Sequence, residues 1–160
     1  KTKEELQEAV DLWCENRDEA LNRYGNISLW DTSLITDMRE LFSEQVGFND
    51  NINNWDVSSV TDMSRMFYKA ELFNQPLNSW DVSSVTNMYL IFGRAIKFNQ
   101  PIDSWDVSSV DDMNNMFKEA SSFNQPLNSW KFNFLNDETG KMFDGASSFD
   151  KNNALWYDFD

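Results

Sequence analysis

The sequence predicts an α/β repeat solenoid, in which each coil contains a short strand and a short helix. The first observation is a fixed period, because tryptophans recur every 25 or 26 residues, at Trp30, Trp55, Trp80, Trp105, Trp130 and Trp156. The second is that the sequence of residues 73–85 returns almost unchanged at residues 98–110. Such a period is typical of a solenoid, in which each coil buries its apolar face only against its neighbours.

The first 25 residues lie outside the repeat and predict an N-terminal helical cap. Thr2 followed by Glu5 has the spacing of a capping box, and apolar residues then return at three- or four-residue steps. Gly25 stands where a helix C-cap needs a residue that tolerates positive φ. We therefore expect one amphipathic helix over residues 3–24, covering the apolar end of the first coil.

The spacing of apolar residues in one part of each coil predicts a short helix. Val60, Met63 and Met66 follow helical spacing, and the same positions are apolar one period later. Ser59 is the expected N-cap, and Asp62 follows three residues later, where a carboxylate favours the start of a helix.

The residue types in the rest of each coil predict a bend followed by a short strand. Pro76 disfavours helix at Gln75, and Asn74 suits a tight turn. Residues 77–82 then predict a short extended segment. Stacking coils of this kind predicts a curved, leucine-rich-repeat-like ribbon.

The pattern also predicts how the chain is organised. The repeat changes between Lys131 and Lys141, where one residue is inserted, and terminal repeats are expected to be atypical. We expect one structural domain made of a helical cap (residues 1–25), four 25-residue repeats (residues 26–130) and an atypical C-terminal capping repeat (residues 131–160).

The chain is strongly acidic, with 13 basic and 27 acidic residues and a formal net charge of −14. That charge repels phosphate backbones and anionic bilayers, so we do not expect nucleic acid as a partner. No apolar run approaches the ~20 residues of a membrane span, so we expect no membrane insertion. We expect the chain to be a monomer.

The residue types present argue against an enzyme. The chain has no His and a single cysteine, Cys14, so it lacks the common general base, the usual zinc ligand and an intrachain disulfide. It contains no Gly-rich phosphate loop and no Ser nucleophile elbow. Acidic residues are abundant, but they repeat in the same surroundings, whereas an acid and base pair needs two different ones.

The repeated aromatic residues have two interpretations. They could line a carbohydrate groove, or they could form the packed core. Every coil carries them at the same phase, so we interpret the Trp and Phe columns as core.

A column of carboxylates, formed by Asp31, Asp56, Asp81 and Asp106, also has two interpretations. Carboxylates one coil apart repel each other, and a bound calcium ion would relieve that repulsion. Alternatively, each Asp accepts backbone N–H bonds in its Asp-Val-Ser-Ser turn. The chain has neither EF-hand spacing nor a Gly-rich Asp nonapeptide, so we favour the turn. Calcium is the one cofactor that the sequence leaves open.

Positions that differ from coil to coil are the candidates for partner specificity. They should lie on the exposed face of the expected helices, where nothing in the repeat fixes them. An ordinary solvated surface is one interpretation. The other is a binding cluster of Arg65, Tyr68, Tyr89 and Arg94, since Tyr and Arg dominate binding hot spots.

The string Phe-Asn-Gln-Pro-Leu-Asn-Ser-Trp-Asp-Val-Ser-Ser-Val-Thr-Asn-Met, at residues 73–88, resembles the repeat of the BspA-like surface proteins. The same repeat is catalogued as a mycoplasma lipoprotein repeat family of unknown function. The resemblance covers residues 25 to about 149. It implies a leucine-rich-repeat-like solenoid on secreted or cell-surface proteins that act in adhesion, and it carries no catalytic residues.

These observations predict a non-enzymatic surface or secreted scaffold that binds a protein or glycan on another surface. One alternative is a calcium-dependent binding module that uses the Asp column. A second is a polysaccharide-acting enzyme that uses two acidic residues.

Overall fold

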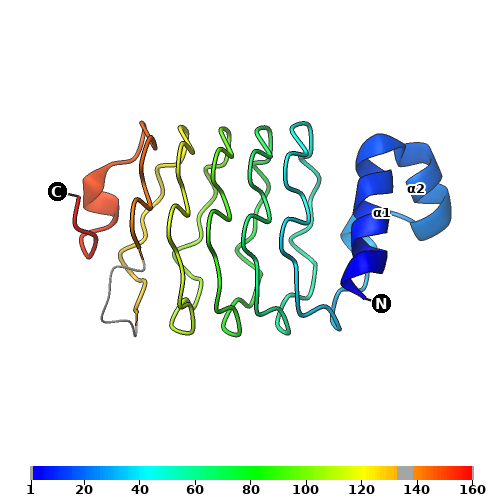
Figure 1. Ribbon diagram of the computed structural model, residues 1–160, viewed down its shortest axis with the longest axis horizontal. Helices are drawn as coiled ribbons and strands as arrows, with labels where there is room; N and C mark the ends of the chain where they lie inside the picture. Colours follow the sequence, from blue (N-terminus) through cyan, green and yellow to red (C-terminus); the bar gives the residue numbers. More distant parts are fainter. Residues whose placement is uncertain (1, 133–138, 160) are drawn as a thin grey trace.

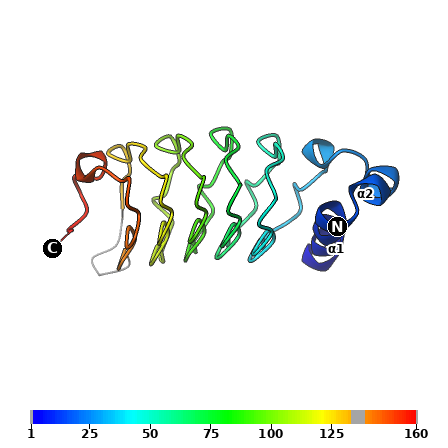
Figure 2. The same ribbon diagram turned by 90° about the horizontal axis from the view of Figure 1, so that it is seen from above.

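Residues 2–132 and 139–159 are described by a computed structural model of the chain (Figure 1). Helices α1 (Lys3–Glu15) and α2 (Arg17–Tyr24) form the N-terminal end, and coils of backbone follow side by side in a row (Figures 1 and 2). Two short 3-10 helices, η1 (Ile27–Leu29) and η2 (Lys151–Asn153), complete the helical elements of the described residues. The two chain ends lie at opposite ends of the row.

The predicted α/β, leucine-rich-repeat-like solenoid is wrong, because the described coils contain neither an α-helix nor a β-strand. Their backbone is made of turns and isolated parallel bridges, which join Asp37 to Asp62, Asp62 to Asn87 and Asn87 to Asp112. Where a helix was expected, Met66 donates its N–H to the carbonyl of Met63 at 3.1 Å, which closes a three-residue turn.

The helix is absent because alternate peptide groups of this segment bond to the next coil. The N–H groups of Met38, Glu40, Phe42 and Glu44 donate to the carbonyls of Asp62, Ser64, Met66 and Tyr68 at 2.7–3.0 Å. The next two coils repeat the four bonds, and we call this set the backbone ladder. An α-helix would need the same N–H groups for its own bonds. Each turn bond joins residues three positions apart, such as Met63 and Met66, so the spacing of the apolar residues imitates that of a helix.

The ladder places two residues of each coil in the left-handed backbone region. The described non-glycine residues with positive φ, between 53° and 63°, are Glu40, Glu44, Arg65, Lys69, Leu90, Arg94, Asn115, Glu119 and Lys141. Residues held in this way cost roughly 1–3 kcal/mol each. The contacts between coils therefore outweigh a local backbone preference that opposes this conformation.

The segment expected to be a strand, residues 77–82, is also turned. The N–H of Trp80 donates to the carbonyl of Leu77 at 3.2 Å, and the N–H of Val85 donates to that of Val82 at 2.9 Å. Backbone groups that a strand would offer to its neighbours are therefore used locally.

The helix expected over residues 3–24 is interrupted at Asn16. The capping box is present, since the N–H of Glu5 donates to Thr2 Oγ1 and the N–H of Thr2 donates to Glu5 Oε2. Asn16 ends α1 with φ −143°, and its side chain accepts the N–H of Glu19 at 3.2 Å to start α2. Gly25 ends α2 with φ 71°, as expected of a C-cap.

Aromatic columns form the core and run through the coils. The ring of Phe92 stacks on Phe67 and Phe117 of the neighbouring coils at 5.6 and 5.7 Å, and on Phe98 of its own coil at 3.9 Å. These side chains have no exposed surface. The interpretation of the Phe columns as core, and not as a carbohydrate groove, is confirmed.

Polar side chains also join neighbouring coils. The indole N–H of each repeat Trp from Trp55 onward donates to a backbone carbonyl of the previous coil, as from Trp80 to Ile52 at 3.1 Å. On another side of the coil, the backbone N–H of Asn99 donates to Asn74 Oδ1 at 3.0 Å, and this bond also recurs in each coil. The Asn bonds satisfy a backbone N–H at a turn, and the indole bonds add a second donor to a carbonyl that already accepts a backbone N–H, as Ile52 does from Trp55.

The final coil is only partly regular. Residues 133–138, in the stretch expected to diverge from the repeat, lie outside the described residues. Beyond them the ladder resumes, since Phe117 donates its N–H to the carbonyl of Met142 at 2.9 Å. Trp156 then stacks on Trp130 at 6.2 Å, and Phe159 stacks on Phe143 at 5.7 Å, so the C-terminal tail extends the aromatic columns.

Candidate functional site

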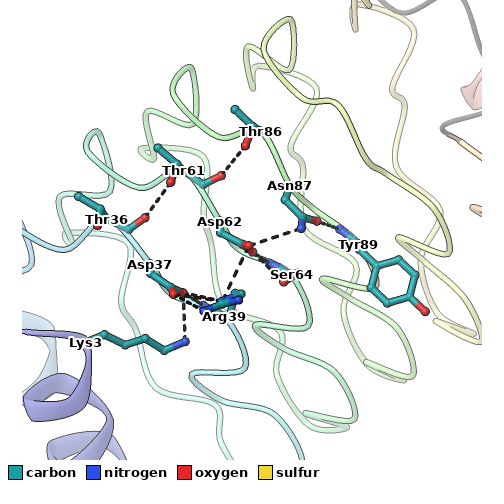
Figure 3. Close-up of polar contacts among 10 residues, drawn as sticks. All are labelled: Lys3, Thr36, Asp37, Arg39, Thr61, Asp62, Ser64, Thr86, Asn87 and Tyr89. Carbon is teal, nitrogen blue, oxygen red and sulfur yellow. Dashed lines mark hydrogen bonds and ion pairs between the residues drawn. The ribbon is translucent and has the colours of Figure 1, made fainter.

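One face of the coil row collects many of the side chains that could bind a partner. It is formed by residues 36–45, 61–70, 86–95 and 111–120, and we call it the ladder face. Along its edge, Thr61 donates from both its backbone N–H and its Oγ1 to the carbonyl of Thr36, at 2.8 and 3.2 Å (Figure 3). Thr86 makes the same two bonds to Thr61.

The next position along the face is a row of Asp and Asn side chains, Asp37, Asp62, Asn87 and Asp112. Each accepts the backbone N–H of the residue two positions later, at 2.8–3.0 Å. In Figure 3 the side chains of Asp37, Asp62 and Asn87 follow one another from coil to coil, and the ring of Tyr89 points away from them. Asp62 therefore fixes a turn, and not the helix start that the sequence predicted.

Cations reach this row from two directions. Lys3 of α1 donates to Asp37 Oδ1 at 3.0 Å, and the guanidinium of Arg39 contacts Asp37 at 2.8 Å and Asp62 at 3.8 Å. Burial raises the pKa of Asp37, but hydrogen bonds from Arg39 and Lys3 outweigh it, so its pKa lies below the usual value. The carboxylates of Asp37 and Asp62 are therefore paired with cations of the protein itself.

The four residues predicted to bind a partner are brought together on the ladder face. The guanidinium carbon of Arg65 lies 5.8 Å from the ring centre of Tyr68 and 5.6 Å from that of Tyr89. Arg94 and Tyr68 line one shallow depression of about 230 Å³. We call Arg65, Tyr68, Tyr89 and Arg94 the Arg-Tyr cluster.

Leu90 also lines the depression, next to a small residue of the third coil. Gly93 stands at the position of Tyr68 and Lys118 in the neighbouring coils. A Cβ atom at Gly93 would lie 2.5 Å from Leu90 Cδ2, so the Leu90 side chain covers this position instead.

Acidic residues of neighbouring coils pair with the cations around this cluster. Arg94 makes two hydrogen bonds to Glu119 at 2.8 and 3.2 Å, Lys69 makes one to Glu44 at 2.7 Å, and Arg65 lies 3.6 Å from Glu40. The bond to Glu44 raises the pKa of Lys69. All these side chains are substantially exposed, and ion pairs in contact with solvent contribute little to stability. Replacing them should therefore affect binding more than folding.

Sequence reasoning missed the Thr and Asp rows as structural features of this face. Their signal was present in the sequence, because a Thr-Asp, Thr-Asn or Asp-Asp pair precedes Met at a fixed period. It also missed the pairing of Lys69 with Glu44, since no sequence rule places these residues in adjacent coils before the coil geometry is known.

The Asp column that raised the question of calcium lies outside the ladder face. Asp31, Asp56, Asp81 and Asp106 are exposed, and each accepts the N–H of the Ser two residues later, at 3.0–3.1 Å. These hydrogen bonds are the ones expected if each Asp stabilises its Asp-Val-Ser-Ser or Asp-Thr-Ser-Leu turn. In the described ranges, no group of three or more His, Cys, Asp or Glu side chains is arranged to hold a metal ion.

These turn bonds predict an acid-sensitive contribution to stability. Hydrogen bonds from the Ser83 hydroxyl and N–H hold the pKa of Asp81 below its usual 3.8, and Asp56 and Asp106 behave alike. A lowered pKa stabilises the fold above the unfolded-state value, and this stabilisation is lost as the pH falls through the folded-state value. We expect a variant with Asn at all three positions to lose less stability than the wild type between about pH 5 and about pH 2.

The measurement is the urea midpoint of both proteins across this pH range. Asn keeps an oxygen that accepts the turn N–H but does not titrate, so the difference between the two curves isolates the carboxylates. Parallel curves would contradict the proposed role of these Asp residues.

Cys14 is not suited to nucleophilic chemistry. Burial raises the pKa of its thiol to about 11, and the charges of Asp11 and Asp50 add to the effect. The thiol is therefore protonated at neutral pH, whereas a reactive cysteine needs its thiolate.

A protein-family comparison identifies the repeat. The model described as a Mycoplasma protein of unknown function, DUF285, matches residues 14–103 and 77–158. The chain belongs to the DUF285 family. Neither the comparison with curated proteins nor that with solved structures found a significant match for this DUF285 chain.

The DUF285 repeat therefore corresponds to the coil described above. Its Trp and Phe positions form the buried columns, and the positions that differ between coils include those of the Arg-Tyr cluster. Among the described residues, no helix combines the length and apolar character needed to cross a bilayer.

Proposed function

We propose that this chain is a non-enzymatic scaffold that binds a protein or glycan through the ladder face. The observation that carries the proposal is the Arg-Tyr cluster, in which Arg65 lies against the rings of both Tyr68 and Tyr89. Tyr and Arg side chains supply much of the energy of protein interfaces, and Tyr offers a large contact area at low entropic cost. No catalytic step is part of the proposal.

The cluster is held by the backbone ladder, which favours binding without rearrangement. The N–H of Arg65 donates to the carbonyl of Tyr89 at 2.8 Å, and the N–H of Glu44 donates to that of Tyr68 at 2.7 Å. A surface that is already ordered loses less entropy when a partner binds. The side chains of Arg65 and Arg94 remain 43% and 46% exposed, so they are open to contact.

The resemblance of residues 73–88 to the BspA-like surface repeat supports a secreted or surface-displayed location. An adhesive role on another surface agrees with this location and with the acidic composition, which favours solubility. Fold and family alone do not define a partner, so the proposal depends on the cluster.

The test begins with arrays of glycans and extracellular proteins probed with the wild-type chain. A variant with Ala at Arg65, Tyr68, Tyr89 and Arg94 should then lose at least tenfold in affinity for any binder found, because it removes the hot spot. Its urea midpoint should stay close to that of the wild type, because the ion pairs that it breaks lie at the surface.

The matched control replaces Ser59, Ser84 and Ser109 with Ala. These residues are exposed in the turns of the Asp column, away from the cluster. The control should bind as the wild type does. Equal binding by the cluster variant, or equal loss by both variants, would overturn the proposal.

A further inference from the structure

Another cavity lies at the N-terminal end of the row, where the two helices meet the first coil. It has a volume of about 380 Å³ and is lined by Glu5, Leu6, Glu8, Ala9, Tyr24 and Trp30. Sites for small ligands in proteins usually have volumes of about 300–1,000 Å³. None of the lining residues belongs to the ladder face, so a ligand in this cavity would bind independently of the Arg-Tyr cluster.

The break at Asn16 and the turn at Gly25 build this cavity. Asn16 ends α1 and begins α2, and the two helices pack against each other (Figure 1). Tyr24 is the last residue of α2, and Gly25, with φ 71°, then turns the chain toward the first coil. The indole N–H of Trp30 donates to the carbonyl of Gly25 at 3.2 Å. This bond holds the Trp30 ring next to the end of α2.

Two aromatic rings form a corner of the cavity. The centres of the Tyr24 and Trp30 rings lie 6.0 Å apart, and their planes are inclined at 74°. A cation is attracted to the face of an aromatic ring when it lies within about 6 Å of the ring centre. A cation in this corner therefore comes within reach of both rings. Tyr24 is 39% exposed, so its ring is accessible from solvent.

The Trp30 ring is held in place before any ligand binds. It stacks on the ring of Trp55 at 6.3 Å, and it meets the ring of Trp13 edge-on at 5.8 Å. Its indole N–H is already bonded to Gly25. A wall that is ordered in advance loses little entropy when a ligand binds, which favours affinity for a small molecule.

Carboxylates line the same cavity. Glu5 and Glu8 are three residues apart on α1, so they lie next to each other on the helix surface. Glu5 is held by the capping box, since the N–H of Thr2 donates to its Oε2 at 3.0 Å. Among the residues that the structure describes, the carboxylate of Glu8 has no hydrogen bond or ion pair. Glu8 is therefore available to pair with a bound cation.

The apolar lining selects between kinds of cation. Leu6 and Ala9 are buried and offer no side-chain acceptor. A primary ammonium group carries three N–H donors, which would lose water in this cavity and find few acceptors. A trimethylammonium group has no donor to satisfy, and its methyl groups can pack against Leu6 and Ala9 while its charge lies over the rings.

The charge around the cavity disfavours ligands that carry an anion close to the ammonium group. Two carboxylates and no Lys or Arg line the cavity, and the whole chain has a formal net charge of −14. A phosphate attached near the ammonium group would be brought close to Glu5 and Glu8, which repel it.

We propose that the cavity between α1, α2 and the first coil binds a small organic cation with a trimethylammonium group, such as choline. The cationic group lies in the corner of Tyr24 and Trp30, its methyl groups contact Leu6 and Ala9, and Glu8 pairs with its charge. This site goes beyond the proposed function and shares no residue with the Arg-Tyr cluster.

The experiment is an NMR titration of the full chain at constant ionic strength. The probes are choline, its uncharged isostere 3,3-dimethyl-1-butanol, ethanolamine and phosphocholine. Choline should shift the signals of Tyr24 and of the Trp30 indole N–H, and it should bind about tenfold more tightly than each of the other probes. The indole N–H of Trp80, in the middle of the row, should not shift.

Matched variants separate the ring from the charge. Tyr24→Leu should weaken choline about fivefold, whereas Tyr24→Phe keeps the ring and should bind as the wild type does. Glu8→Gln should weaken choline about threefold. Glu15→Gln removes the same charge from an exposed position of α1 outside the cavity, and it should leave the affinity for choline unchanged.

The proposal is overturned if choline shifts neither the Tyr24 nor the Trp30 signal, or if it binds no better than any one of the other probes. Unchanged affinity in Tyr24→Leu would overturn it as well, because the ring would then have no role. Shifts confined to Tyr68 and Tyr89 would place the cation on the ladder face and have the same consequence. The proposed function would stand in each case, since the Ala variant of the Arg-Tyr cluster tests it separately.

Discussion

Replacing Phe92 with Ala should lower the free energy of unfolding by about 3–5 kcal/mol. Phe92 has no exposed surface and stacks on rings of both neighbouring coils and of its own coil. Removing it opens a cavity in the middle of the row, and neighbours in the same column cannot close it without losing their own stacking. Because coils stabilise each other only through their interfaces, one substitution weakens two of them.

The measurement is urea unfolding followed by circular dichroism, with Leu34→Ala as the control. Leu34 is 75% exposed, so its loss should change stability by no more than about 0.5 kcal/mol. Similar losses in the two variants would contradict a core built on the Phe columns.

Replacing Trp80 with Phe should lower the free energy of unfolding by about 0.5–1.5 kcal/mol through the loss of one buried hydrogen bond, before any loss of packing. The indole N–H of Trp80 donates to the carbonyl of Ile52 at 3.1 Å, and this ring is only 4% exposed. Phe keeps an aromatic ring in the column but has no donor. The carbonyl of Ile52 keeps its bond from the backbone N–H of Trp55 at 3.0 Å, so the cost is that of one hydrogen bond at a site with little access to water.

Trp156→Phe at the end of the row is the matched control. Trp156 makes the corresponding bond to Leu127 at 2.8 Å, but its side chain is only partly buried. Solvent can replace that bond, so we expect the smaller loss here. Both variants are compared by urea midpoint, and an equal or larger effect at Trp156 would contradict the role assigned to the buried indole bond.

Sequence patterns identified the repeat and its core because both depend on residue type and period alone. The Phe67, Phe92 and Phe117 positions were expected to be buried, and they are. The capping box of Thr2 and Glu5 and the C-cap at Gly25 also formed as expected, since capping depends on bonds within a few residues. The break at Asn16 was missed, although Asn is a favoured N-cap residue.

The secondary structure of the coils could not be predicted in the same way. Val60, Met63 and Met66 have a spacing that fits both a helix and a chain of three-residue turns. The helix and the series of turns differ in the positive φ of Arg65 and Lys69. Neither residue type favours that backbone conformation. The preference comes from hydrogen bonds to a coil 25 residues away, which no local rule contains.

The candidate site could likewise be predicted only in part. Arg65, Tyr68, Tyr89 and Arg94 were chosen because they differ between coils, and the structure places them on one face. Whether they bind a partner stays a prediction. The ladder bonds that hold these residues had no sequence signal, because the bonding of a backbone group does not depend on the identity of its side chain.

The sequence by itself therefore determined the period, the buried aromatic columns and the family, since each is written in the types of residues that recur. The tertiary structure alone decided the course of the backbone between those residues and the direction of the ladder bonds. The physical reason is that peptide groups are the same in every residue. Their partners are chosen by the packing of whole coils, which overrides the local preference of each segment.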